Sequence, residues 1–218
     1  MKKTYIGITG VARSGKNLLA DLLIKNLYDN YGLKAAQVAL ATELKNDCAT
    51  FIKAKLGLNV FTEKTEEKSQ FRDLLVWYGD IMRKRTNGRY WIEKVNKALR
   101  KDKGYNVIIV SDIRYDFYEK DEVYWIKNEL YGKLIHVRKF IEKQSDSGIE
   151  KVYQLPANAH EEKNDPLMLA KSDYKLDWKD VTDGKVGLIK RNDLLEDVYL
   201  NTTVTTMLDQ IMKNVTYI

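Results

Sequence analysis

The feature that most constrains the fold is the segment Gly10-Val11-Ala12-Arg13-Ser14-Gly15-Lys16, which lies between a strand pattern and a helix pattern. The residues before it, 4–9, are rich in β-branched and aromatic side chains and predict a strand. Behind it, leucines recur at helical spacing over residues 18–27. In this setting backbone N–H groups can surround a phosphate, and the helix N-terminus adds partial positive charge. The segment predicts a phosphate-binding loop in which the Lys16 ammonium bridges phosphate oxygens.

One position departs from the usual pattern of such loops. The residue after the lysine is normally a Ser or Thr whose hydroxyl binds Mg²⁺, and here it is Asn17. An amide is a poorer direct ligand than a hydroxyl oxygen but can reach a metal-bound water. The alternative interpretation is a glycine turn between a strand and a helix, with Lys16 solvated in the first helical turn.

Length and composition bound the class of protein. A chain of 218 residues with 44% hydrophobic content can bury a full core and suits one α/β domain with a small insertion. The single cysteine, Cys48, excludes a disulfide framework and suits a reducing compartment; we expect it on the apolar side of a helix. The first residues lack the apolar core of a signal peptide, and no stretch approaches the length of a membrane span. These features predict a cytoplasmic protein without membrane association.

The net charge of +6 raises the question of nucleic-acid binding. Lysines and arginines are interleaved with 31 acidic residues, without the long basic tract of a nucleic-acid-binding arm. Phosphorylated small molecules explain the excess of positive charge equally well. Polynucleotide binding is therefore not expected as the main role.

The pattern along the chain predicts alternating strands and helices. The unbroken apolar run Val107-Ile108-Ile109-Val110 is typical of a central parallel strand that is buried on both faces. Alternation of this kind favours a central parallel sheet of about five strands with helices on both faces. Further strands are expected at 34–39, 133–138 and 174–178, and helices at 42–56 with Thr42 as its cap, 71–82, 90–99, 119–131 and through 207–215. Residues 139–166, which contain both prolines, are expected to be irregular, and 183–189 to form a turn followed by a short apolar run.

Two charged residues follow the buried strand directly, in Ser111-Asp112-Ile113-Arg114. In open α/β sheets the ligand crevice lies at the carboxyl ends of the strands, on the same edge as the phosphate loop. We expect Asp112 to organise Mg²⁺-bound water or accept a proton, and Arg114 to clamp a phosphate. The alternative is a strand-end carboxylate that caps the next turn and pairs with its neighbour.

Other cations could balance substrate charge. Arg72, Arg83, Arg85 and Arg89 crowd the two middle helices, where a solvated helix face is the alternative interpretation. Arg138 ends a strand and could reach donor phosphates when a lid closes. His160 has no neighbouring Cys or second His and is a poor zinc ligand.

Taken together, these segments resemble the bacteriophage deoxynucleoside monophosphate kinases, a branch of the P-loop nucleoside monophosphate kinases. The loop at 10–17, with a basic residue at Arg13, is similar to the family's loop. Arg72-Asp73-Leu74-Leu75…Gly79-Asp80 with Tyr90-Trp91-Ile92 resembles the helices that cover the acceptor base. Further similar segments are Leu40 to Lys45, Ser111 to Tyr115, Ile135 to Arg138, Ala159 to Pro166 and Ser172 to Tyr174.

The resemblance implies one P-loop kinase domain over residues 1–218, with a helical NMP-binding insertion at about 42–103 and a short lid at about 139–166. It implies ATP-dependent phosphorylation of deoxynucleoside monophosphates with Mg²⁺ as cofactor. A monomer and a homodimer are both compatible with it, and a phage-encoded protein would act in the host cytoplasm. The implied catalytic residues are Lys16, Arg114, Arg138 and Asp112; ATP would contact Ala12, Arg13, Ser14, Gly15, Lys16, Asn17 and Arg138; the acceptor would contact Lys45, Arg72, Trp77, Asp80, Arg83, Trp91 and Arg114; and Asn17 and Asp112 would hold the metal through water.

Two alternatives stay open. The first is a P-loop kinase for another phosphorylated metabolite, of the dephospho-coenzyme A or phosphomevalonate type. Aromatic residues such as Trp77 and Trp91 favour a flat base, although they would serve equally in a core. The second is a nucleotide-binding or nucleic-acid-binding protein that has lost catalysis, and the departure at Asn17 would be the sign of that loss.

Overall fold

A computed structural model describes residues 3–101, 104–146, 148–182 and 190–215. Within them, six strands form one sheet in the order β2-β3-β1-β4-β5, and β6 also pairs with β4. All strand pairs are parallel except β4 with β5. The predicted α/β class with a mostly parallel sheet is confirmed. The strands are β1 (Thr4–Thr9), β2 (Ala35–Val38), β3 (Val107–Val110), β4 (Lys133–Ser145), β5 (Gly148–Tyr153) and β6 (Tyr174–Lys179).

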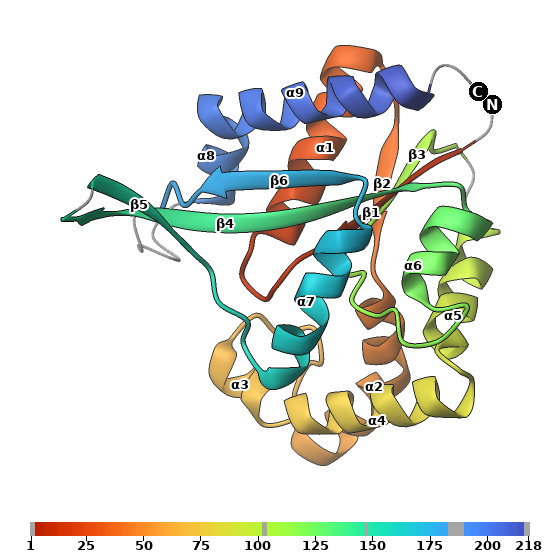
Figure 1. Ribbon diagram of the computed structural model, residues 1–218. Helices are drawn as coiled ribbons and strands as arrows, with labels where there is room; N and C mark the ends of the chain where they lie inside the picture. The colour runs from red at the N-terminus through yellow and green to blue at the C-terminus, as the bar shows by residue number, and fades with distance from the viewer. Residues whose placement is uncertain (1–2, 102–103, 147, 183–189, 216–218) are drawn as a thin grey trace.

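Helices cover both faces of this sheet, as Figure 1 shows. On one face α1 (Lys16–Tyr31), α8 (Arg191–Leu195) and α9 (Val198–Val215) enclose a core with β1, β4 and β6. The other face carries α2 (Leu40–Leu56), α5 (Arg89–Leu99), α6 (Glu122–Tyr124), the π-helical turn η1 (Trp125–Glu129) and α7 (Ala159–Lys171). Helices α3 (Thr65–Ser69) and α4 (Arg72–Arg85) lie farther from the sheet.

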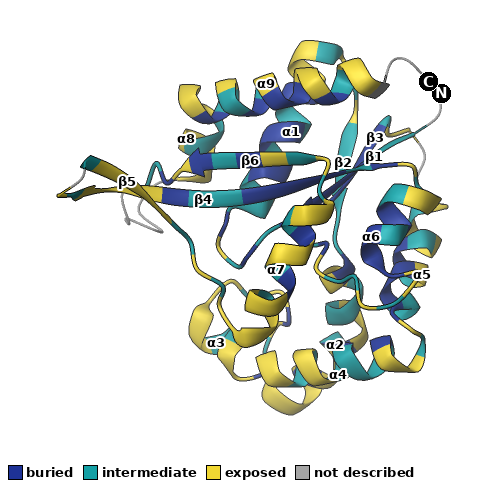
Figure 2. Ribbon diagram, in the orientation of Figure 1, coloured by how far each residue is buried: buried dark blue, intermediate teal, exposed yellow. Residues whose placement is uncertain are grey.

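Burial follows these two layers. The predicted central strand Val107–Val110 is buried at every residue, as its unbroken apolar pattern indicated. In Figure 2 the central strands β1 and β3, the inner part of β4 and the helix stripes that face them are mostly buried, whereas α3 and α4 consist mostly of exposed and intermediate residues. Cys48 is free and buried in a small cluster with Ile52, Val60 and Phe71, as expected for a residue on the apolar side of a helix. No helix in the described part of the chain combines the length and the apolar content that a membrane crossing needs.

The expectation that residues 139–166 are irregular is wrong. Strand β4 continues to Ser145 and pairs with β5 from Phe140 opposite Tyr153 onward, and α7 then begins at Ala159. This hairpin extends beyond the body of the sheet, and most of its outer residues are exposed. A ribbon without a buried face needs no apolar alternation, so its pattern resembles that of a loop. Helix α7 tolerates Pro166 in its interior.

Two helix predictions also need correction. Helix α2 begins at Leu40 rather than at the predicted cap Thr42, because the Asp112 carboxylate accepts hydrogen bonds from the amides of Leu40 and Ala41, each at 2.8 Å. The helix expected over 119–131 is confined to α6 and η1, which Asp121 caps by accepting from the Glu122 amide. The turn and apolar run predicted at 183–189 lie outside the described residues.

Candidate functional site

The phosphate loop lies at the carboxyl end of β1 and leads into α1, as predicted. Gly10 has φ +138°, and a Cβ there would lie 2.4 Å from the Val137 carbonyl oxygen of β4. Gly15 has φ +96°, and its Cβ would lie 2.3 Å from the Trp178 ring of β6. The Trp178 indole also donates to the Ser14 carbonyl at 2.9 Å. Both glycines are required, since the loop backbone presses against two neighbouring strands.

Lys16, the first residue of α1, turns back over the loop. Its ammonium donates to the carbonyl oxygens of Gly10 and Val11, each at 2.7 Å. Burial and the Arg114 charge lower the pKa of Lys16 to about 8, against the opposing effect of the carboxylates of Glu161, Asp112 and Asp165. The ammonium is therefore held at the loop with part of its hydration removed.

A cleft of about 420 Å³ opens beside the loop. A second compartment of about 220 Å³ shares part of its lining and reaches toward α5. Five residues line both spaces: Arg72, Val76, Asp80, Arg114 and Tyr115. The apolar residues of the second compartment include Leu40, Leu44, Leu75 and Trp91, whose indole donates to the Gly79 carbonyl. The site is thus a two-part cleft with guanidinium groups at the junction.

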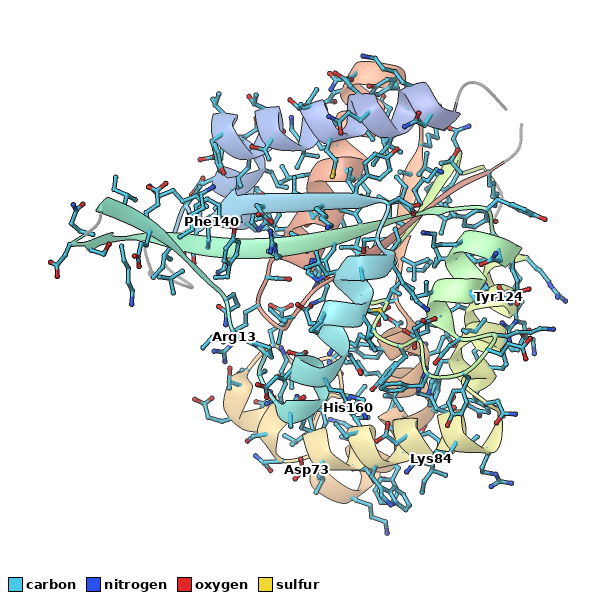
Figure 3. All side chains as sticks on the ribbon, viewed as in Figure 1. Arg13, Asp73, Lys84, Tyr124, Phe140 and His160 are labelled. Carbon is cyan, nitrogen blue, oxygen red and sulfur yellow. The ribbon has the colours of Figure 1, made fainter. Side chains whose placement is uncertain are left out.

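Helix α7 covers the cleft opposite α4. Figure 3 shows His160 at the end of α7 nearest α4, the helix that carries Asp73, and both residues line the larger space. The His160 ring lies 5.3 Å from that of Tyr115 and 5.8 Å from that of Phe117, between centroids. These distances place His160 in an aromatic contact. Within the described residues no three His, Cys, Asp or Glu side chains gather as a metal cluster.

Glu161 is the functional candidate that the sequence analysis missed. Its carboxylate accepts from the Ala12 amide of the loop at 3.0 Å and from Arg114 at 2.9 Å. A local signal was present, because Asn158 three residues earlier is a typical helix cap, and its side chain does accept from the Glu161 amide at 2.9 Å. That signal places Glu161 in the first turn of a helix, although not its contact with the loop.

Arg83 lines the second compartment, but its charge is already balanced. The guanidinium donates to both oxygens of Asp121 at 2.8 and 2.9 Å and to Glu122 at 2.7 Å, and it stacks on the Tyr115 ring. The second Glu122 oxygen accepts from the amides of Arg114 and Tyr115. Burial raises the pKa of Glu122, whereas the Arg83 charge acts to lower it. Arg83 therefore fixes the wall of the cleft, and the geometry gives no support to its predicted contact with substrate.

Arg138 is also engaged elsewhere. It forms a two-pronged contact with Asp177, its register partner on β6, at 2.7 and 2.6 Å, and lies over the Tyr153 ring. It is not among the residues that line the cleft. Its predicted contact with donor phosphates would require this pair to open.

The two predicted metal-site residues lie at the edge of the sheet near the loop. Both oxygens of Asp112 accept the α2 amides described above, which matches the capping alternative; burial raises its pKa, opposed by those amides and by the charges of Arg114 and Lys16. Gln37 bridges Asn17 and Ser111, donating to the Asn17 Oδ1 at 3.3 Å and to the Ser111 hydroxyl at 2.6 Å. Amide, hydroxyl and carboxylate oxygens are of the kind that bind Mg²⁺ directly or accept hydrogen bonds from its bound waters.

The remaining predicted acceptor residues divide into two groups. Arg72, Asp80, Trp91 and Arg114 line the cleft, whereas Lys45 and Trp77 do not. Trp77 is 62% exposed on α4, and the Lys45 ammonium lies 5.6 Å from the centre of the Phe61 ring. Among the loop residues, the Ala12 amide donates to the Glu161 carboxylate, and Arg13 is exposed. Ser14 is buried, and its hydroxyl has no hydrogen-bond partner.

A glycine-rich phosphate loop at the carboxyl edge of a mostly parallel sheet, beside a two-part cleft with arginines, defines a P-loop kinase-like α/β protein. Residues 8–132, more than half of the chain, match the family model of phosphomevalonate kinase. The chain belongs to that family and is a kinase by this relationship. No curated protein matches the sequence. The match supports the predicted kinase class but not the narrower resemblance to phage deoxynucleoside monophosphate kinases.

Proposed function

We propose that the protein transfers a phosphoryl group from ATP to a small acceptor that already carries a phosphate. The observation that carries this proposal is the shared lining of the two compartments by Arg72 and Arg114. Donor and acceptor both bring negative charge to one cleft, and guanidinium groups between them offset that repulsion. A phosphate acceptor is already a nucleophile, so positioning and charge balance supply most of the catalysis.

The donor would occupy the end of the cleft formed by the loop. The amides of residues 12–15 and the Lys16 ammonium are the groups that would hold its phosphates. Asn17 and Asp112 fit Mg²⁺ through water, and the metal would supply charge neutralisation between the phosphates when bound.

For the acceptor we favour phosphomevalonate or a similarly small phosphorylated metabolite. The family match carries that name, and the second compartment is small and walled by leucines such as Leu40, Leu44 and Leu75. Aliphatic walls suit a short aliphatic acceptor whose phosphate points back toward the arginines.

A deoxynucleoside monophosphate is the second candidate. The rings of Trp91 and Tyr115 both line the second compartment and offer flat faces to a base. The sequence resemblance in residues 72–80 and 90–92 supports the same acceptor.

One panel separates these candidates: ADP release from ATP and Mg²⁺ with phosphomevalonate, dephospho-coenzyme A, and each deoxy- and ribonucleoside monophosphate. We expect release that depends on one acceptor class. ATP binding without release in any arm would indicate a non-catalytic binder. Binding to DNA or RNA that weakens steeply with salt would favour the nucleic-acid alternative.

The loop assignment is tested by Lys16→Ala. We expect turnover to fall by at least about 100-fold with the fold retained, because the substitution removes the cation nearest the transferred charge. Lys25→Ala is the matched control on the same helix, where Lys25 pairs with Asp29. Near wild-type turnover in Lys16→Ala, measured alongside circular dichroism, would show that this loop does not hold the donor.

A further inference from the structure

The Glu161 carboxylate lies where the phosphate loop would receive an anion. It accepts from the Ala12 amide, 149 residues away in the sequence, and from the Ala157 amide, both at 3.0 Å and through the same oxygen. Its other oxygen accepts from Arg114 at 2.9 Å, and the side chain is only 12% exposed. One carboxylate thus binds a loop amide and a cleft guanidinium at once.

The charges around Glu161 are those that a phosphate would meet. Burial alone would raise its pKa, but the amides of Ala12 and Ala157 and the charges of Arg114 and Lys16 hold that pKa below its ordinary value. Glu161 therefore stays ionised at neutral pH. The positive charge of the loop, which comes from the partly buried Lys16 ammonium and several amides, is compensated by a carboxylate from α7.

A donor phosphate and this carboxylate cannot use the same groups together. An amide N–H directs one strong hydrogen bond, and two anions that compete for the same amide repel each other in a partly dehydrated cleft. Whatever phosphate oxygen binds the Ala12 amide must first displace Glu161. We propose that Glu161 is an internal competitor of the donor, a carboxylate that occupies the phosphate site until ATP replaces it; this inference rests on the proposed kinase function.

Displacement would link the two compartments. Arg114 lines both of them, and its guanidinium pairs with the Glu161 carboxylate. When Glu161 leaves, the guanidinium becomes available to an acceptor phosphate. Glu161 lies in the first turn of α7, beside His160, whose ring contacts that of Tyr115 in the lining of both compartments. Release of Glu161 would remove the contact of α7 with Arg114 and so weaken the attachment of α7 to that wall. Glu161 is in this sense a positioning residue that makes acceptor binding depend on the donor.

The experiment is calorimetric titration of the full chain with ATP and, separately, with inorganic tripolyphosphate. Glu161→Gln keeps the size of the side chain and removes its charge, and we expect it to lower the dissociation constant of both ligands about tenfold, the scale of one charged hydrogen bond. Glu161→Ala is a second variant with the same expected direction. Glu162→Gln, on the next and exposed residue of the helix, is the matched control and should leave both constants unchanged.

The possible outcomes distinguish the competitor role of Glu161 from the proposed kinase function. Unchanged or weaker binding of both ligands to Glu161→Gln, with normal binding to the wild type, overturns the competitor role and leaves the kinase proposal standing. A wild type that binds neither ATP nor tripolyphosphate refutes the loop assignment, and both proposals fail together. A second readout is structural: ATP without acceptor should speed hydrogen exchange at the Ala157 amide in the wild type, since its partner leaves.

Discussion

Two arginine–carboxylate contacts flank the cleft, and they differ in their access to water. Arg83 and its partners Asp121 and Glu122 have side chains that are 6%, 0% and 4% exposed, whereas Arg114 is 45% and Glu161 12% exposed. In the buried group no solvent can replace a lost partner, so the contact is permanent. In the pair of Arg114 with Glu161, water or a ligand can reach the half-exposed guanidinium and take the place of its partner. Contacts between arginine and carboxylate therefore have two roles here. The contact of Arg83 fixes the wall of the cleft, whereas that of Arg114 with Glu161 can be exchanged for a ligand.

The largest effect is expected where the buried group is broken. Arg83→Leu should lower the free energy of unfolding by about 3–5 kcal/mol, because it leaves two carboxylates buried without a cation. Urea unfolding measures this loss. Arg85→Leu is the control, an exposed arginine on the same helix, and should change stability by less than about 0.5 kcal/mol. Equal losses of unfolding free energy in Arg83→Leu and Arg85→Leu would show that the buried Arg83 contacts do not stabilise the fold.

A smaller effect is expected from pH on ATP binding, through Lys16, which lies in the field of the Arg114 and Glu161 charges. Because burial and then Arg114 lower the pKa of Lys16 to about 8, the free protein loses this ammonium as pH rises above that value. ATP binding then requires proton uptake by the protein, so affinity should fall about tenfold per pH unit above pH 8.

Titrations at pH 8.5 in buffers of different ionisation enthalpy measure that proton uptake directly. Lys16→Ala is the control and should show no break near pH 8. In Glu161→Gln the break should move to lower pH, since Glu161 raises the pKa of Lys16. If the ATP affinity of the wild type and that of Glu161→Gln begin to fall at the same pH, the Glu161 carboxylate does not act on Lys16.

The smallest effect on stability is expected when the pair of Arg114 with Glu161 is removed. Arg114→Leu should cost less than about 1 kcal/mol of unfolding free energy, the scale of an exposed ion pair. Acceptor-dependent turnover should nevertheless fall, because Arg114 lines both compartments. Urea unfolding and ADP release on the same preparation measure both quantities. A loss of stability as large as that of Arg83→Leu would mean that Arg114 also belongs to the wall.

The fold was predictable wherever burial leaves an apolar pattern in the sequence, either periodic or unbroken. Val107–Val110 and Thr4–Thr9 are strands because apolar or β-branched residues must face a core on both sides. The start of α2 was not predictable, because its cap, Asp112, lies 72 residues from Leu40. The outer part of β4 was hidden for the opposite reason, since a ribbon without a buried face has no apolar period.

The candidate site was predictable at the loop and less so around it. Spacing alone indicates Gly10, Gly15 and Lys16, because the loop backbone demands the two glycines and a phosphate-binding loop ends on a lysine. Spacing cannot show which carboxylate will meet a given arginine. Arg138 meets Asp177 only through the register of two strands, and Ala12 meets Glu161 only through the placement of α7. Long-range pairing decided which of the predicted cations face the cleft.

The contact between the loop and Trp178 has a consequence for biosynthesis. The indole donates to the Ser14 carbonyl across 164 residues of sequence and packs against Gly15, so the last strand of the sheet completes the loop. During translation the N-terminal segment emerges first, long before that strand is made. A nascent chain that has not yet extended past residue 178 lacks this support, and the loop at residues 10–16 gains it only late in synthesis.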